Sequence, residues 1–333
     1  MNIYDISKLA GVSIATVSRV LNGNEKVSEK TKKRVLDIIE QQGYTPNVFA
    51  QGLGLNTMKT IGLLCTDASD IYQAKAIYFI EELLRAQGYD SILCCSGFQL
   101  QSKEKCMALL LAKKVDALIL IGSSFVYEDP EKDRYICEAA KQVPVMLLNA
   151  ALEAPNVYGV VSDEENSVFD ATTQLIDRGI TDILYFYNST SYSGKRKLLG
   201  YRQAMEAKGL LNEKRIHFFG NNSEDIPGMA NYLMQLRRNG LQFHGIITSN
   251  DQLALAAIKY AKKAGLSIPE DLAIIGYDNS MLSCCSDPEL TSIDVQMESL
   301  CQRLVANLML ALKGEEVPTV TTLPGHIFYR ETT

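Results

Sequence analysis

The sequence predicts an α/β protein in which a small helical N-terminal domain precedes a larger body built on parallel sheets. Two observations support this prediction. Residues 1–43 show three short runs of helical periodicity, and from residue 60 onward short apolar runs alternate with amphipathic stretches. Because about ten such units exceed one ordinary sheet, we expect two similar subdomains in the body. The length of 333 residues accommodates two to three domains.

The expected N-terminal helices are defined by their caps. Asn2 is a favourable N-cap, and Asp5, three residues later, resembles the second half of a capping box. Gly11 ends this first helix, and Ser13 caps a second helix that continues to about residue 21. Ser28 caps a third helix, whose apolar residues recur at helical spacing.

From residue 60 onward, the apolar runs predict the strands of parallel sheets. Amphipathic stretches such as 74–85 and 103–113 follow the early runs and predict the helices that cover the sheets. Strands are expected at 61–65, 91–95, 117–121, 145–148, 183–187, 216–219, 245–248 and 273–275.

The composition is that of a folded protein. Hydrophobic residues make up 47% of the chain and charged residues 22%, which is typical of a globular protein rather than a disordered one. No run of about 18 apolar residues occurs, so neither a transmembrane helix nor a membrane partner is expected. The first residues lack the basic and apolar segments of a signal peptide, so a cytoplasmic protein is expected.

Charge is distributed unevenly along the chain. Residues 1–60 contain 8 Lys/Arg and 5 Asp/Glu, whereas the remaining residues contain 25 and 34. A basic N-terminal domain on an acidic body indicates that this domain alone approaches a polyanion. The alternative is chance, because the excess of positive charge is modest.

The eight cysteines show neither a disulfide framework nor zinc-binding spacing. None forms a C-x-x-C pair, and the three histidines are scattered. We therefore expect no metal, no cofactor and a reducing compartment, with Cys65, Cys94 and Cys95 acting as small hydrophobic residues of strands. An enzyme on a nucleotide-binding fold is an alternative, but neither G-x-G-x-x-G nor G-x-x-x-x-G-K-[ST] occurs.

The turn at residues 11–12 joins two helices in a way that is typical of a helix-turn-helix unit. The second helix of such a unit lies in the major groove and contacts base edges through its first turns. Arg19 can form a bidentate pair with guanine or contact a phosphate, and Ile14 and Ala15 offer apolar contacts to a thymine methyl. From these residues alone, a generic helical subdomain explains the pattern equally well.

The complete run from Ile3 to Gly23, IYDISKLAGVSIATVSRVLNG, resembles the headpiece of the LacI/GalR family of bacterial transcription regulators. The similarity continues through Val27-Ser28, Tyr44-x-Pro46-Asn47 and Ala50-Gln51-x-Leu53. It extends over essentially the whole chain, with further matches in VPV at 143–145, GYRxA at 200–204, NDxxA at 250–254, IPEDL at 268–272, GYDN at 276–279 and PxLT at 288–291.

This resemblance implies sequence-specific DNA binding by a homodimer. Residues 1–46 would form the helix-turn-helix headpiece, and residues 47–59 a hinge helix and linker. Leu53 matches the leucine that wedges into the minor groove at a central CpG step, so the implied partner is a double-stranded pseudopalindromic operator with a central CG; a plain linker is the alternative. The residues implied in DNA binding are Tyr4, Ser13, Ile14, Ala15, Thr16, Ser18, Arg19, Asn22, Asn47, Ala50, Gln51 and Leu53.

The resemblance also implies that residues 60–333 form an effector-binding and dimerisation domain similar to periplasmic sugar-binding proteins. Three crossovers would join an N-subdomain, about 60–160 and 293–321, to a C-subdomain, about 161–292 and 322–333. A small sugar-like effector would bind in the cleft at the carboxyl ends of the strands. The implied pocket residues are Tyr72, Asn149, Lys197, Asn250 and Asp278. The alternatives are helix capping by the strand-end side chains and a solvated Lys197.

The implied function is regulation, most simply repression, of carbohydrate-utilisation genes, without enzymatic activity. A catabolite-control regulator that uses a phosphocarrier protein as corepressor is the alternative within the family, although Glu298 and Ala306 stand where docking residues are expected. A pure solute-binding protein would have no use for residues 1–58.

We expect a dimer, because the helix at 74–85 carries more apolar surface than one face needs. Cys284 and Cys285 are expected to be buried.

Overall fold

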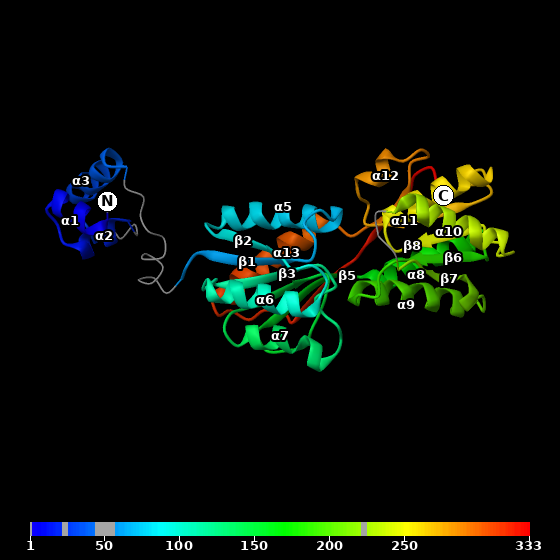
Figure 1. Ribbon diagram of the computed structural model, residues 1–333, viewed down its shortest axis with the longest axis horizontal. Helices are drawn as coiled ribbons and strands as arrows, with labels where there is room; N and C mark the ends of the chain where they lie inside the picture. Colours follow the sequence, from blue (N-terminus) through cyan, green and yellow to red (C-terminus); the bar gives the residue numbers. More distant parts are fainter. Residues whose placement is uncertain (1, 22–25, 44–56, 221–224) are drawn as a thin grey trace.

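The computed structural model describes residues 2–21, 26–43, 57–220 and 225–333. A helical headpiece lies at one end of the long axis, followed by an N-terminal lobe and a C-terminal lobe (Figure 1). Asn22 and the hinge positions Asn47, Ala50, Gln51 and Leu53 lie outside the described residues.

The described residues of the headpiece form three helices: α1 (Ile3–Ala10), α2 (Ile14–Leu21) and α3 (Glu29–Gln41). The predicted capping box is present, because the Asn2 side chain accepts hydrogen bonds from backbone amides and Asp5 accepts one from the Asn2 amide. Gly11 ends α1 in the left-handed conformation, with φ 58°. The apolar faces of the helices meet in a small core of buried residues: Ile6, Ala10, Val17, Val20 and Val35.

The N-terminal lobe contains a six-stranded parallel sheet in the order β11-β5-β4-β3-β1-β2. Its strands are β1 (Thr60–Cys65), β2 (Asp90–Cys95), β3 (Ala117–Ile121), β4 (Val145–Leu148), β5 (Val157–Ser162) and β11 (Val320–Leu323). One face is covered by α5 (Ile71–Ala86) and α13 (Met297–Leu312), and the other by α6 (Leu100–Ala112) and α7 (Pro130–Ala140). Because both faces are covered, β3 and β4 are continuous runs of buried apolar residues.

The C-terminal lobe contains a second six-stranded sheet in the order β12-β10-β9-β8-β6-β7, which is parallel except for β12. Its strands are β6 (Ile183–Tyr187), β7 (Ile216–Phe218), β8 (Gly245–Thr248), β9 (Ala273–Tyr277), β10 (Thr291–Asp294) and β12 (His326–Phe328). Helices α8 (Glu164–Asp177) and α9 (Tyr192–Ala207) cover one face, and α10 (Ile226–Arg238) and α11 (Asp251–Ala264) cover the other. A 3-10 turn (Glu213–Arg215) precedes β7, and the short α12 (Met281–Cys285) follows β9.

The chain passes between the lobes three times, after β5, β10 and β11. These strands end at Ser162, Asp294 and Leu323, two residues beyond the expected limits at 160, 292 and 321. The strands continue because their last residues still pair: Leu323 with Ser162, and Asp294 with His326. The crossovers therefore start directly at the paired ends of strands.

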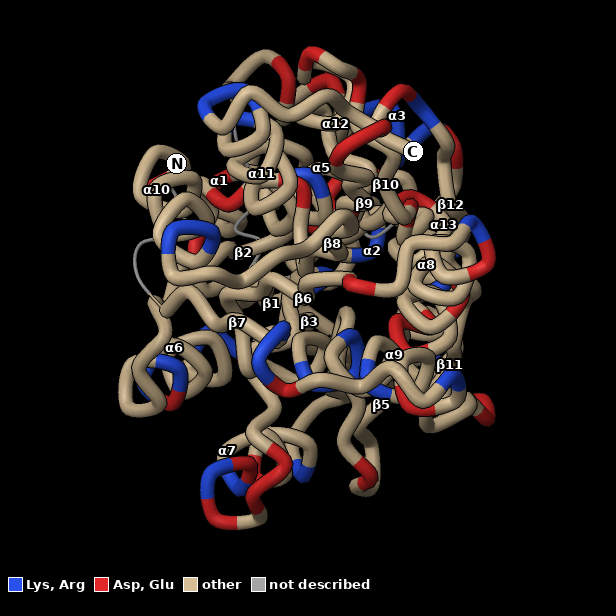
Figure 2. The backbone as a smooth tube through the Cα atoms, turned by 90° about the vertical axis from the view of Figure 1, so that its right-hand side faces the viewer, with Lys and Arg blue, Asp and Glu red and all other residues tan. Residues whose placement is uncertain are grey.

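Charged residues lie mainly on the helices and loops, whereas the strands of both sheets are largely free of them (Figure 2). None of the helices in the described part of the chain combines the length and apolarity that a membrane crossing requires.

The cysteines depart from the expected pattern of burial. Cys65 is buried as expected, but Cys94 is half-buried and Cys95 is exposed, because β2 is the edge strand of its sheet. The expectation that Cys284 and Cys285 are buried is wrong for the single chain, because both are exposed on the short surface helix α12.

Candidate functional site

A cavity of about 250 Å³ lies between the lobes, at the carboxyl ends of the strands. This is where open α/β sheets bind their ligands. Tyr72 and Asn149 line it from the N-terminal lobe, and Lys197, Asn250 and Asp278 line it from the C-terminal lobe. The structure therefore brings together all five residues that the sequence pointed to, although they are far apart along the chain.

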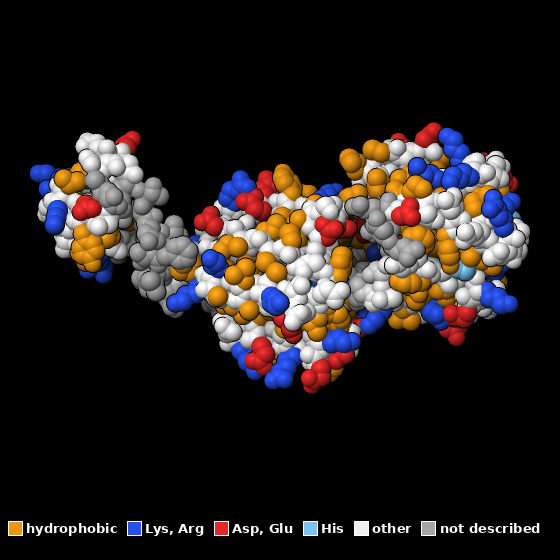
Figure 3. Space-filling model, in the orientation of Figure 1, with side chains coloured by type: hydrophobic (Ala, Val, Ile, Leu, Met, Phe, Trp, Pro, Cys, Tyr) orange, Lys and Arg blue, Asp and Glu red, His pale blue; other side chains and the backbone are white. Residues whose placement is uncertain are grey.

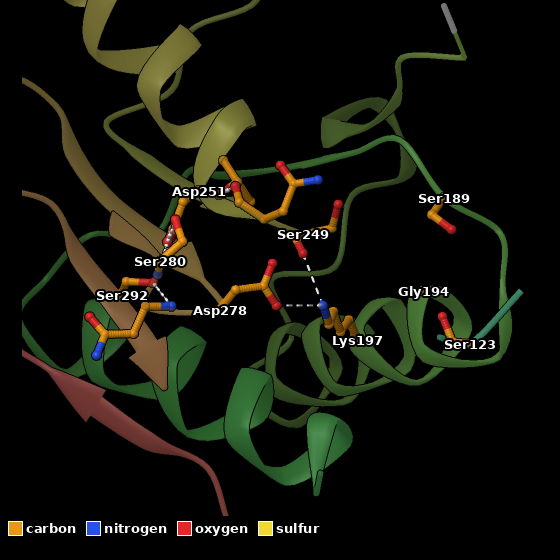
Figure 4. Close-up of polar contacts among 12 residues, drawn as sticks. Ser123, Ser189, Gly194, Lys197, Ser249, Asp251, Asp278, Ser280 and Ser292 are labelled. Atoms are coloured by element: carbon orange, nitrogen blue, oxygen red, sulfur yellow. Dashed lines mark hydrogen bonds and ion pairs between the residues drawn. The ribbon is translucent and has the colours of Figure 1, made fainter. Parts of the chain in front are cut away.

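Lys197 and Asp278 form the charged centre of this cleft (Figure 4). Lys197 lies in the second turn of α9 with 8% of its side chain exposed. Its Nζ donates a hydrogen bond to the Ser249 carbonyl at 3.0 Å and lies 4.0 Å from Oδ1 of Asp278. The same nitrogen is 3.6 Å from the centroid of the Tyr277 ring. A carbonyl, a carboxylate and an aromatic face thus hold the ammonium, which excludes the alternative of a solvated lysine.

Asp278 directly follows β9 and has a left-handed backbone, with φ 98°. Burial raises the pKa of its carboxyl group, and the nearby Lys197 ammonium opposes that increase. About a fifth of the side chain, 21%, is exposed. An ionised carboxylate can accept several hydrogen bonds, so Asp278 can bind more than one hydroxyl group of a ligand.

Two polar groups that line the cavity are buried without a hydrogen-bond partner among the described residues, the Tyr72 hydroxyl and Oδ1 of Asn149, and Oε1 of Glu164 is likewise unpartnered outside the cavity lining. Glu164 begins α8 and is 2% exposed; burial raises its pKa to about 7, while Lys197 lowers it. Buried polar groups are normally paired. A ligand that carries several hydrogen-bond donors would complete this arrangement.

Hydroxyl groups line the other end of the cleft. Ser123, which follows β3, donates a hydrogen bond of 2.8 Å to Ser191, the N-cap of α9, and so bridges the two lobes. The amide of Tyr192 donates to the Ser123 carbonyl at 3.3 Å. Gly194 is required in the first turn of α9, because a Cβ there would overlap the carbonyl oxygen of Ser189. The N-terminus of α9 is therefore capped by the protein itself.

Asn250 has a structural role in addition to its place in the cleft. Its Oδ1 accepts a hydrogen bond from the Leu253 amide at 3.0 Å and caps α11, which is the alternative that the sequence left open. Its Nδ2 donates to Oδ1 of Asn188 at 3.2 Å. The amide of Asn250 is thus oriented before a ligand arrives.

Sequence reasoning missed several residues of the cleft. Ser123 and Asn188 follow the predicted strands β3 and β6 closely, so the rule that ligands bind at carboxyl ends of strands could have identified both. Gln73 holds the loop between β1 and α5, because its Oε1 accepts hydrogen bonds from the amide and hydroxyl of Thr66. Glu164 lies behind the cavity lining and carried no local signal in the sequence, because only its burial distinguishes it from other acidic residues at helix N-termini.

The headpiece presents a second candidate surface at the start of α2. Val17 and Val20 are buried and anchor the helix to the headpiece core, so the opposite face of α2 is left to solvent. Most of the described residues that are expected to contact DNA are exposed: Tyr4, Ser13, Ile14, Ala15 and Arg19. Thr16 and Ser18 are half-buried. Ser13 also caps α2 through the Thr16 amide at 3.2 Å.

Comparison with known proteins finds relatives of the whole chain. Residues 2–47 match the family described as "Bacterial regulatory proteins, lacI family", and residues 172–333 match "Periplasmic binding protein-like domain". An HTH-type transcriptional regulator of Lachnoclostridium phytofermentans is 50% identical and covers 100% of this chain and 99% of its own. Catabolite control protein A of Priestia megaterium is 33% identical over 100% of this chain and 99% of its own.

Solved structures share the fold. The lac repressor dimer bound to operator and the anti-inducer ONPF has a TM-score of 0.90 at 24% identity, covering 100% of this chain and 98% of that one. The complex of the transcriptional regulator CelR with cellobiose has a TM-score of 0.72 at 25% identity, covering 100% of both chains.

Proposed function

Because the chain belongs to the LacI family of transcriptional regulators, we propose that it is a homodimeric repressor of carbohydrate-utilisation genes, controlled by a small sugar in the interlobe cleft. Its curated relatives are transcriptional regulators, and this chain is likewise a DNA-binding regulator and not an enzyme. The observation that carries the proposal is the convergence of Tyr72, Asn149, Lys197, Asn250 and Asp278 on one cavity between the lobes. We place its action in the cytoplasm, where its operator would be.

The chemistry of the cleft favours a polyhydroxylated effector. Oδ1 of Asn149 and the Tyr72 hydroxyl have no hydrogen-bond partner among the described residues, and the Asp278 carboxylate lines the same cavity. A sugar carries hydroxyl donors on several sides and can satisfy groups of both lobes at once, which favours closure of the cleft. The CelR complex with cellobiose is a relative of similar fold with such a ligand.

The distribution of charge favours a neutral sugar over a phosphorylated one. The Lys197 ammonium is already held by Asp278 and the Ser249 carbonyl, and Asp70 adds a second carboxylate to the cavity lining. A helix N-terminus is the other common anion site, but amides in the first turn of α9 are bonded to Ser123 and Ser191. A phosphate would therefore meet carboxylates without an available cation among the described residues that line this cavity.

The proposed DNA contact combines α2 with the hinge. Arg19, Ile14 and Ala15 would contact base edges in the major groove, and Leu53 would wedge into the minor groove at a central CG. The lac repressor dimer bound to operator is a relative of similar fold in a DNA complex.

A homodimer is supported by an apolar surface that one copy leaves exposed. Tyr78 on α5 is 62% exposed and Met281 on α12 is 71% exposed. Hydrophobic side chains gather over these two helices (Figure 3). A two-fold dimer through this face would bury the surface and would place two headpieces with the symmetry of a pseudopalindrome.

The second candidate, a catabolite-control regulator with a phosphocarrier corepressor, has one observation in its favour, the 33% identity to catabolite control protein A. The outward face of α13 carries Glu298, Gln302 and Ala306 with a single basic residue, Arg303. Such a face is weakly suited to a phosphorylated partner, so we favour the sugar-controlled regulator.

The test is DNase footprinting of the full-length protein on the regions upstream of its own and neighbouring genes, with a panel of neutral sugars. We expect protection centred on a dyad with a central CG, and one sugar that changes the protection. In a Leu53→Ala variant the footprint should weaken while nonspecific DNA affinity stays the same. A footprint without dyad symmetry, or one that no sugar in the panel alters, would contradict the proposal.

A further inference from the structure

Two cysteines end neighbouring strands of the N-terminal sheet with their sulfur atoms in contact. Cys65 is the last residue of β1, Cys95 is the last residue of β2, and the two are register partners in the parallel pair. Their Sγ atoms are 3.4 Å apart. We propose that Cys65 and Cys95 form a redox-sensitive dithiol that hydrogen peroxide converts to an intramolecular disulfide.

The backbone geometry is compatible with this bond. Adjacent strands lie about 4.7–4.9 Å apart, which is within the range of about 4.4–6.8 Å between Cα atoms that disulfides span. Register partners of a parallel pair point to the same face of the sheet, so the Cβ atoms of Cys65 and Cys95 do not diverge. The sulfurs must approach from 3.4 Å to about 2.05 Å, which needs side-chain rotation and a small shift of the edge strand.

The two thiols differ in accessibility. Cys95 is exposed on the edge strand, whereas Cys65 is buried. Burial, reinforced by contact with Cys95, raises the pKa of the Cys65 thiol to about 12, so Cys65 stays protonated and shielded from direct oxidation. Cys95 is therefore the thiol that reacts with the oxidant, and Cys65 is the resolving thiol, which then forms the disulfide with it.

The reaction proceeds in two balanced steps. The Cys95 sulfur attacks one oxygen of hydrogen peroxide, the O–O bond breaks, and Cys95 sulfenic acid and one water form. The Cys65 sulfur then attacks the sulfenic sulfur, the S–O bond breaks, and the hydroxide leaves with the Cys65 proton as a second water. Two thiols are oxidised and one peroxide is reduced to two waters.

The pair lies where β1 and β2 lead into loops of the cleft. The amide of Ser96 donates to the Cys65 carbonyl at 2.9 Å, so the two loops already contact each other at this point. Thr66, the next residue after Cys65, and Phe98, three residues after Cys95, both line the cavity. A bond between Cys65 and Cys95 therefore fixes the spacing of two loops that form one wall of the cleft.

The neighbouring Cys94 provides a matched control. It stands next to Cys95 on the same strand but packs with Cys106 of α6 on the other side of the sheet. Cys94→Ser and Cys95→Ser are thus the same chemical change at adjacent positions of an edge strand. Neither removes a fully buried side chain, so both variants are expected to fold.

The experiment treats reduced full-length protein with hydrogen peroxide, blocks the remaining thiols, and analyses tryptic peptides by mass spectrometry. Trypsin releases Cys65 in peptide 60–75 and both Cys94 and Cys95 in peptide 86–103. We expect a reducible link between these two peptides in the wild type and in Cys94→Ser, and none in Cys95→Ser. The number of free thiols in denatured protein should fall from eight to six.

Several outcomes would overturn the proposal. One is a bond between Cys94 and Cys95 within the same peptide, or between Cys94 and Cys106. Another is a covalent dimer on a non-reducing gel, which would mean that Cys95 reacts with a second copy rather than with Cys65. A third is the finding that, after peroxide treatment and unfolding, Cys65 is still a free thiol that is fully alkylated.

Discussion

Replacing Asp278 with asparagine tests the effector cleft with little disturbance of the backbone. Asp278 has φ 98°, a region that asparagine tolerates better than alanine does. Asparagine also conserves the volume of the side chain. One acceptor oxygen remains, while an NH2 donor stands in place of the second. The substitution therefore removes charge and one acceptor at the centre of the cleft.

The expected magnitude follows from the loss of charge assistance. A hydrogen bond to a charged group contributes about 1.5–3 kcal/mol, and a neutral one about 0.5–1.5 kcal/mol. If Asp278 accepts bonds from two hydroxyl groups, the difference is about 2–3 kcal/mol. This weakens effector affinity about 30- to 140-fold. Lys197, 4.0 Å from the carboxylate, loses its counter-charge in the same variant, which adds to the effect.

The affinity of the wild-type protein for its effector should also increase with pH. Burial raises the pKa of Asp278 and also the pKa values of the nearby Asp70 and Glu164. The Lys197 ammonium opposes this increase at Asp278 and at Glu164. An effector that needs the ionised Asp278 releases a proton when it binds, so affinity rises as pH increases through the raised pKa and levels off above it. Asp278→Asn should retain only the smaller dependence that Asp70 and Glu164 contribute.

The assay is isothermal titration calorimetry with neutral monosaccharides, disaccharides and sugar phosphates, from roughly pH 6 to roughly pH 9. Asp177→Asn, the same charge change at an exposed position of α8, is the control and should bind sugar as the wild type does. Operator affinity of the unliganded variants, measured by fluorescence anisotropy, should be unchanged. An Asp278→Asn protein that binds the sugar within about twofold of wild type would refute this reasoning.

Three further substitutions test other parts of the molecule. Arg19→Ala should weaken operator binding by about 1–3 kcal/mol and relax preference at the base it contacts, as measured by competition with operator variants; an equal loss on all sequences would assign Arg19 to a phosphate. Gly200→Ala should lower the free energy of unfolding by about 1–3 kcal/mol, because a Cβ would overlap the Glu165 carbonyl between α8 and α9; an unchanged urea midpoint would contradict this. Glu128→Gln removes ion pairs of 2.8 Å to two cations of α9 across the lobes. Because these side chains are about a third to a half exposed, effector affinity should change by less than about fivefold, and a larger change in calorimetry would contradict that estimate.

Features that depend on nearby residues could be predicted from the sequence. The Asn2 capping box and the Ser28 cap join groups within three positions of each other, so their residue types identify them. The bounds of β3, β4, β6 and β8 matched the predicted runs, because strands buried on both faces read as continuous apolar segments. The strands β5, β10, β11 and β12 were not predicted. β11, for example, alternates exposed and half-buried residues at the edge of its sheet and carries no apolar run.

The sequence by itself determined the helical headpiece and the parallel α/β body, and its resemblance to a known family predicted pocket positions such as Asn149 and Asp278. Only the tertiary structure decided what these groups meet. The contact of Lys197 with Asp278 and the bridge from Ser123 to Ser191 join elements far apart along the chain. The burial of Glu164 likewise depends on how the two lobes pack beside a crossover. Caps and periodicity follow from hydrogen bonds and side-chain spacing within one element, whereas these contacts arise only when the crossovers set the ends of two sheets against each other.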